Sequence, residues 1–304
     1  QSHRGCICTR YTMKKINYHT HTYRCGHAKG NEEDMIMAAI RNGIEELGLS
    51  DHIPLPRYRL HLLKSVPSIR SLKSLISLVY AMIKNGPNMR MPYKTIDEHL
   101  EIINELSEKY QKDIKIYKGF EAEGIEEYFD FYQDLLSSHK VDYLILGNHF
   151  HKYCIHSCYY GRKNLTKEAL YNYCEDVEKA LETQLFSYLA HPDLFIMGYH
   201  DFGEDMQIVT RRICKKAKEL NIPLEINAGG IRRGKRMING EELYLYPNPY
   251  FFKIASEIGN DVIIGIDAHD PKDMNREVVQ ELERFAKELN LNLIGHIKFL
   301  KGNN

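Results

Sequence analysis

Short apolar runs alternate with amphipathic, helix-like stretches along the whole chain, and this alternation restricts the fold more than any other property. Strand-like runs that each precede a helix-like stretch are typical of βα units with parallel strands. Seven or eight such units favour a closed α/β barrel, although periodicity alone also permits an open, doubly wound sheet. The expected strands cover residues 15–18, 44–49, 114–117, 143–146, 186–190, 223–226 and 262–266, with a further candidate at 291–294. The expected helices cover residues 32–42, 96–110, 126–138, 166–182, 204–220, 248–258 and 273–289.

The 304 residues show no linker that would divide this pattern, so we expect a single domain over residues 13–304. Residues 1–12 contain no signal-peptide apolar stretch and precede Met13, a natural starting residue next to the first strand. We expect them to be an extension outside the fold.

An insertion over residues 53–96 follows the second expected strand and is too long for an ordinary loop. Leu72, Leu75, Ile76 and Val79 recur at helical spacing, which predicts a helix. The insertion contains no acidic residue, and its basic residues are Arg57, Arg59, Lys64, Arg70, Lys73, Lys84, Arg90 and Lys94. A solvated helical excursion explains this composition as well as a cationic lid that attracts an anionic substrate.

The composition indicates a protein that acts on small molecules. Lys and Arg together number 41, as do Asp and Glu, and there is no sustained basic stripe, so we expect no nucleic-acid partner. No apolar run approaches the roughly 20 residues that span a bilayer, so we expect no membrane partner. The seven cysteines form no paired Cys-x-x-Cys spacing, which favours reduced thiols in the cytoplasm. The oligomeric state is left open.

Polar groups capable of binding metal follow every expected strand. In His19-Thr20-His21 the two imidazoles share one face of an extended segment, because residues i and i+2 point the same way. In a parallel α/β barrel, the carboxyl ends of the strands carry the active site. In strand order these groups are His19, His21 and His27, then Asp51 and His52, Glu121 and Glu123, Asn148 and His149, His191 and Asp193, Asn227, and Asp267 and His269.

Imidazole and carboxylate groups without thiolate suit Zn²⁺, Fe²⁺ or Mn²⁺. The set exceeds the three or four protein ligands that one catalytic ion takes, which predicts more than one ion. Glu121 by its position is expected to bridge two ions, and Glu123, on the same strand face, is the alternative.

Several motifs occur together in one order: His19-Thr20-His21-Thr22, Gly48-Leu49-Ser50-Asp51-His52, Gly119-Phe120-Glu121, Gly147-Asn148-His149, Ala190-His191-Pro192 and Gly265-Ile266-Asp267-Ala268-His269. In these motifs the chain resembles the polymerase and histidinol phosphatase (PHP) family. The segment from Leu224 to Arg232, followed by Tyr246-Pro247, is similar to the monofunctional histidinol-phosphate phosphatases of that family. The resemblance implies a distorted (β/α)7 TIM-like barrel with three divalent metal ions.

The resemblance also implies a ligand set for each ion. One ion would take His19, His21, Glu121 and Asp267, a second would take Glu121, His149 and His191, and a third would take His27, His52 and His269.

The implied activity is hydrolysis of L-histidinol phosphate to L-histidinol and phosphate, a step of histidine biosynthesis. Glu121, Asp267 and His191 are the expected catalytic residues, and Arg232, with Arg162 second, is expected to bind the phosphate. Two alternatives stay open, a PHP phosphoesterase that acts on nucleotides or another small phosphate ester, and a metal-binding protein without catalysis.

Overall fold

A computed structural model describes residues 15–69, 71–84 and 89–299 of the chain. The expected extension over residues 1–12 and the basic residue Arg70 lie outside the described residues.

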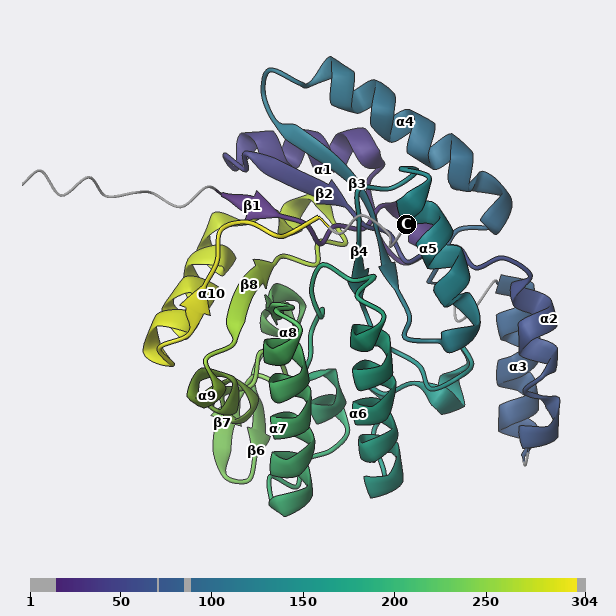
Figure 1. Cartoon of the computed structure of the whole chain (residues 1–304), viewed down its shortest axis with the longest axis vertical. Helices are drawn as coiled ribbons and strands as arrows, with labels where there is room; N and C mark the ends of the chain where they lie inside the picture. Colours follow the sequence, from purple (N-terminus) through teal and green to yellow (C-terminus); the bar gives the residue numbers. More distant parts are fainter. Residues whose placement is uncertain (1–14, 70, 85–88, 300–304) are drawn as a thin grey trace, which may run out of the picture.

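The centre of the molecule is a curled sheet of parallel strands (Figure 1). Its first half contains, in pairing order, β1 (Ile16–Asn17), β2 (Glu46–Leu49), β3 (Lys115–Ala122) and β4 (Tyr143–Leu146). Its second half contains, in pairing order, β5 (Leu224–Asn227), β8 (Asp261–Gly265) and β9 (Asn292–Leu293). Each of these strands overlaps a range predicted from the alternation, so the α/β class with parallel strands is confirmed.

The predicted strand over residues 186–190 joins the two halves without forming a regular strand. Leu189 makes isolated parallel bridges to Leu146 on β4 and to Leu224 on β5. The Leu189 amide donates to the Pro223 carbonyl at 3.0 Å, but proline has no amide hydrogen to continue the ladder. The position of this segment in the sheet was predicted correctly, and its regular strand geometry was predicted wrongly.

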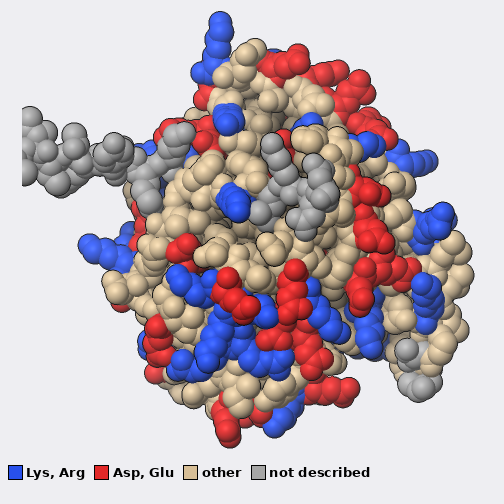
Figure 2. Space-filling model, in the orientation of Figure 1, with Lys and Arg blue, Asp and Glu red and all other residues tan. Residues whose placement is uncertain are grey.

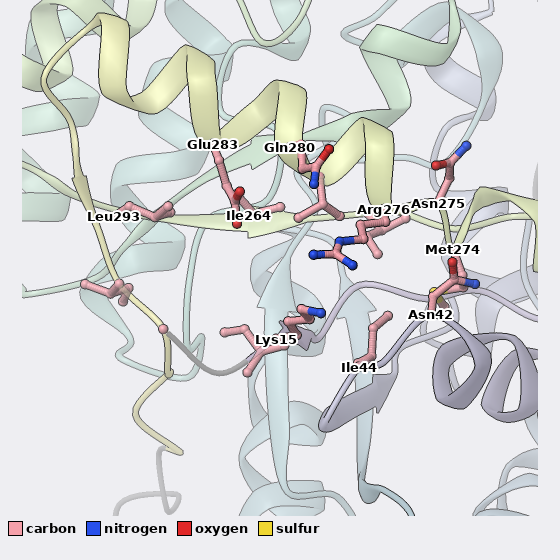
Figure 3. Close-up of a pocket in the computed structure, with 15 residues that line it drawn as sticks. Lys15, Asn42, Ile44, Ile264, Met274, Asn275, Arg276, Gln280, Glu283 and Leu293 are labelled. Atoms are coloured by element: carbon pink, nitrogen blue, oxygen red, sulfur yellow. The ribbon is translucent and has the colours of Figure 1, made fainter. Parts of the chain in front are cut away.

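Strands β1 and β8 approach each other near their carboxyl ends. Thr20, which follows β1, forms an isolated parallel bridge with Ala268, which follows β8. Further back, the strands separate, and a pocket of about 130 Å³ lies beside Ile16, Ile264 and helix α10 (Arg276–Glu288) (Figure 3). Strands β1 and β8 therefore meet at their carboxyl ends, and the predicted site residues lie at the same ends.

Long helices cover the outside of the sheet (Figure 1). With α10 they are α1 (Glu32–Arg41), α4 (Ile96–Lys109), α5 (Phe129–Ser137), α6 (Lys167–Glu182), α7 (Glu204–Glu219) and α9 (Pro249–Ile258). Side chains of Asn31, Thr166 and Asn275 accept hydrogen bonds from the first-turn amides of α1, α6 and α10, which explains where these helices begin. All seven helices agree with the predicted ranges.

The described part of the insertion contains two α-helices, α2 (Tyr58–Leu63) and α3 (Leu72–Lys84), at one edge of the molecule (Figure 1). The predicted helix is therefore confirmed as α3. The residues that predicted it face outward, however, since Leu72 is 72% and Ile76 is 60% exposed, whereas Leu78 and Ala81 are buried against the body. After β5 the chain also forms α8 (Ala228–Arg232) and a hairpin of β6 (Arg236–Ile238) and β7 (Glu241–Leu243), which the sequence pattern did not predict.

Acidic and basic side chains are mixed over α6 and α7 on the face shown in Figure 2. Arg212 and Lys216 on α7 pair with Glu178 and Glu182 on α6, respectively. Over the part of the chain that the structure describes, no helix is both long and apolar enough to cross a membrane.

A buried polar network fixes the loop after β1 to its neighbours. Asp51 accepts hydrogen bonds from the amide and the hydroxyl of Thr22, at 2.7 and 2.8 Å. Two residues further on, Arg24 donates to Glu32 on α1, and Glu32 also accepts from His99 Nδ1 at 2.8 Å. Burial alone would raise the pKa of Glu32, but the hydrogen bonds from His99 and Arg24 hold it at about 2.

This network predicts an acid-dependent contribution to stability. Glu32 has a lower pKa in the folded chain than the 4.5 it has when free, so its contribution is full above pH 4.5 and is lost as the pH falls towards 2. Metal-free Glu32→Gln protein should be less stable than the parent by about 2 kcal/mol at neutral pH. Urea unfolding from pH 7 to pH 3 should show this difference shrinking below pH 4.5, and a difference that stays constant would contradict the assignment.

Candidate metal centre

His19 and His21 converge at the end of β1, as their spacing predicted. Both side chains are completely buried, and their Nε2 atoms lie 3.1 Å apart. The side-chain amide of Asn17 donates to the His19 carbonyl and to the Thr20 hydroxyl, which holds the backbone of this turn. The two imidazoles therefore point at one position inside the curled sheet.

Glu121, at the end of β3, is the point around which the imidazoles gather. Its Oε1 lies 2.8 Å from His191 Nε2 and 3.4 Å from His149 Nε2. Its Oε2 lies 2.9 Å from His52 Nδ1, and Nε2 atoms of His19 and His21 are 3.4 and 3.3 Å away. Oε2 is buried and makes no hydrogen bond despite these neighbours, so the surrounding nitrogens do not satisfy it.

Gly147 makes room for this carboxylate. A Cβ atom at position 147 would lie 2.0 Å from Glu121 Oε1, a separation that no side chain could adopt without displacing the glutamate. The glycine of the Gly147-Asn148-His149 motif is thus explained by close approach to Glu121 rather than by a turn.

Asp267 and His269 complete the cluster from the end of β8. Asp267 Oδ1 lies 3.4 Å from His19 Nε2 and 3.3 Å from His21 Nε2. His269 Nε2 lies 3.0 Å from Nε2 of His27, which is at the exposed side of the cluster. Asp267 and His191 have φ angles of 51° and 29°, in a region that side-chain-bearing residues seldom adopt. Such backbone strain is common at functional sites.

The donor atoms form overlapping groups that fit metal ions. Among the described residues, sets of three donor atoms within 4.8 Å of one another are His19, His21 and Glu121; His52, Glu121 and His149; His27, His52 and His269; and His21, Cys25 and His269. Burial raises the pKa of the Cys25 thiol to about 12, so this sulfur is protonated at neutral pH when no metal is bound. The other three groups contain only imidazole and carboxylate donors.

The carboxylates of the cluster are held in their ionised form. Burial would raise the pKa of Glu121, but His149, His52 and His19 hold it well below its usual value. The pKa of Asp267 is held down in the same way, chiefly by His19 and His21. Both carboxylates are therefore anionic at neutral pH. Burial and the neighbouring His21 lower the pKa of His269 to about 3, so its ring is neutral and able to donate a lone pair.

Two further glutamates orient the imidazoles. Glu225 accepts from His19 Nδ1 at 2.8 Å and from the His191 amide at 2.9 Å. Glu123 accepts from the amide of His149 at 2.8 Å, and its Oε1 lies 3.2 Å from His149 Nδ1. Hydrogen bonds to the far ring nitrogen fix the tautomer of a metal-binding histidine. Glu121 thus lies among the imidazoles, whereas Glu123 lies behind His149.

The arginines are arranged differently from the expectation. Arg232 donates to the carbonyls of Ile266 and Asp267, and Arg162 donates to the carbonyl of Tyr159. Neither side chain lines the cleft in front of the cluster, whereas Arg233 does. The sequence offered no signal to distinguish Arg233 from Arg232, because the choice depends on how the short helix α8 is oriented.

The cluster opens into a cleft of about 460 Å³. Its lining includes Glu121, Asp267, His27, His52, His149, His191 and His269, together with Phe150, His156, Tyr159, Leu194, Arg233 and Tyr246. The insertion contributes Tyr80 and Met89 to this lining, and none of its described arginines or lysines is among the lining residues. His156, which is exposed, lies at the edge of the cleft.

The PHP domain family model matches residues 17–229. The chain belongs to the PHP family. The family predicted from the motifs is therefore confirmed, and the structure brings Asp267 and His269, from beyond the matched segment, to the same site.

Curated and solved relatives agree with this assignment. A Deinococcus radiodurans protein named probable histidinol-phosphatase is 23% identical over 261 residues, which cover 83% of this chain and 85% of the relative. A Listeria monocytogenes protein assigned as the histidinol phosphatase HisK has a similar fold, with a TM-score of 0.66, 22% identity and coverage of 88% of this chain and 99% of the other. The Lactococcus lactis histidinol phosphate phosphatase HisK, solved with zinc, L-histidinol and phosphate, has a TM-score of 0.64, 15% identity and coverage of 94% and 99%.

The geometry predicts different consequences for the two glutamates of β3 and its following loop. Glu121→Gln should lower zinc affinity and any metal-dependent turnover by more than about 100-fold, because the shared donor is lost. Glu123→Gln should lower zinc affinity by about 10- to 100-fold, the range usual for groups that only orient a metal ligand. Metal content after dialysis and competition with a chelating indicator would measure both, and a larger loss in Glu123→Gln would contradict the placement.

Proposed function

We propose that this chain is a metal-dependent phosphomonoester hydrolase that converts L-histidinol phosphate and water to L-histidinol and phosphate. The observation that carries the proposal is the cluster of imidazoles around Glu121, which faces a cleft that also contains a guanidinium group, that of Arg233. The histidinol phosphatase names of the relatives, and the zinc, histidinol and phosphate in the Lactococcus structure, support this choice of substrate.

The donor groups fit three divalent ions, which we propose as Zn²⁺, Fe²⁺ or Mn²⁺. The proposed ligands are His19, His21, Glu121 and Asp267 for one ion, Glu121, His149 and His191 for the second, and His27, His52 and His269 for the third. Bound in this way, such ions lower the pKa of water and neutralise charge on phosphoryl oxygens. Asp267, which is held ionised, is suited to stabilising a cation rather than to donating a proton.

The walls of the cleft suit the rest of the substrate. Arg233 is positioned to bind phosphoryl oxygens, which guanidinium groups hold through two parallel hydrogen bonds. Phe150, Tyr159 and Tyr246 present aromatic surface beside it, and a planar imidazole can stack on such rings. We propose that the phosphate end of histidinol phosphate lies towards Glu121 and its imidazole end lies among these rings.

We also propose that the curled sheet is a distorted (β/α)7 barrel. Seven of the parallel segments support this, namely β1 to β4, residues 187–190, β5 and β8, and the Thr20 to Ala268 bridge joins the segments that follow β1 and β8. A cytoplasmic location is proposed because the cysteines that the structure describes are free thiols.

A substrate panel tests the activity. Metal-loaded protein should release phosphate from L-histidinol phosphate with kcat/KM on the order of 100-fold above that for nucleoside monophosphates or simple alkyl phosphates, because the cleft walls hold the histidinol part. A higher kcat/KM for a nucleotide would contradict the proposed substrate. Tight metal binding without turnover of any phosphate ester would contradict the proposed activity and favour a metal-binding protein without catalysis.

Two neighbouring arginines should respond differently to substitution. Arg233→Met should lower kcat/KM by about 100-fold and leave metal content unchanged, because its guanidinium faces the cleft. Arg232→Met should instead weaken metal binding, because it frees the backbone that carries Asp267. Arg211→Met on the surface of α7 is the control for loss of a charge. Unchanged kinetics in Arg233→Met would overturn the proposed phosphate contact.

A further inference from the structure

Arg90, near the end of the insertion, is buried beside the metal centre. The residue is 4% exposed, and its Nη2 lies 3.1 Å from Glu123 Oε1 in an ion pair whose two side chains are each 1% exposed. Other described arginines and lysines of the insertion, such as Arg57, Arg59 and Lys64, are at the surface. Burial of one guanidinium among exposed ones requires compensation by a partner, and Glu123 provides it.

The partner of Arg90 controls His149. Glu123 Oε2 accepts from the backbone amides of His149 and Phe150, at 2.8 and 3.3 Å. Its Oε1 faces both Arg90 Nη2 and His149 Nδ1, so a carboxylate fixed by Arg90 selects the tautomer with hydrogen on Nδ1. The His149 Nε2 lone pair is then directed at the cluster, where it lies 3.4 Å from Glu121 Oε1.

Arg90 also contacts the segment that carries another candidate ligand. Its Nε donates to the Ile53 carbonyl at 3.2 Å, directly after His52. The Ile53 amide in turn donates to the Glu121 carbonyl at 2.8 Å. One guanidinium therefore connects the backbone beside His52 with the carboxylate behind His149. Lysine cannot replace both contacts, because an ammonium group lacks the fork of donors at two fixed positions.

We propose that Arg90 is a positioning residue of the metal centre that acts through Glu123 on His149. The inference rests on the proposed metal-dependent function, and it gives the insertion a role in the centre although its helices α2 and α3 lie at the edge of the molecule. No contact of Arg90 with substrate is required.

A double-mutant cycle on zinc affinity tests this role. Arg90→Met should weaken binding of the weakest-bound ion by about tenfold, as loss of an orienting partner does. In the Glu123→Gln background the same substitution should have little further effect, because the group through which Arg90 acts is already neutral. Tyr58→Phe is the matched control, since it removes a hydrogen bond from the insertion to the Cys154 carbonyl without touching Glu123, and it should leave zinc affinity unchanged.

The readouts separate this proposal from the proposed function. Zinc stoichiometry, zinc affinity and the visible spectrum of the Co²⁺-loaded protein all report the ligands without any substrate. If Arg90→Met does not fold, Arg90→Lys replaces it and should give a smaller loss of affinity in the same direction. Full additivity of the Arg90 and Glu123 effects, or an equal loss in Tyr58→Phe, would overturn the proposal, whereas failure to hydrolyse histidinol phosphate would overturn only the substrate.

Discussion

The structure depends on how the negative charge of the buried Glu121 carboxylate is compensated. Nitrogens of His19, His21, His52, His149 and His191 lie within 3.4 Å of Glu121, which is 2% exposed. Crowded imidazoles cannot all carry protons, and a buried carboxylate without a cation is costly. Divalent metal ions resolve both problems, since each ion takes the lone pairs of several imidazoles and the charge of the carboxylate at once.

The curled parallel sheet makes this crowding possible. The residues that follow β1, β2, β3, β4, β5 and β8 lie at the same end of the sheet, and the bridges of Thr20 with Ala268 and of His52 with Glu121 bring these segments into contact. Small residues then allow the carboxylates to enter. A Cβ at Gly147 would strike Glu121, and a Cβ at Gly265 would lie 1.7 Å from Glu225 Oε1. Gly147 and Gly265, each from one of the motifs, thus leave the space that the carboxylates of Glu121 and Glu225 occupy.

Much of the fold and most of the cluster could be predicted from the sequence because both follow from local periodicity. A strand has a period of two residues, so His19 and His21 had to share a face, and the end of each strand could be located from its apolar run. The missing parts depend on tertiary contacts. Arg90 could not be distinguished from the exposed basic residues of the insertion, since its burial depends on tertiary contacts such as those with Glu123 and Tyr58. Arg233 was missed for a similar reason, because the orientation of α8 decides which of two adjacent arginines faces the cleft. Glu225 did carry a signal, as a charged residue between the apolar residues Leu224 and Ile226 of a strand.

The most direct test of the central claim is anomalous X-ray diffraction from crystals of the protein prepared without chelators, recorded on both sides of the zinc, iron and manganese absorption edges. The account predicts anomalous peaks on both sides of the Glu121 carboxylate, one towards His19 and His21 and one towards His149 and His191, with a further peak between His27 and His269. Absence of any peak within bonding distance of Glu121, in protein that elemental analysis shows to be metal-loaded, would contradict it.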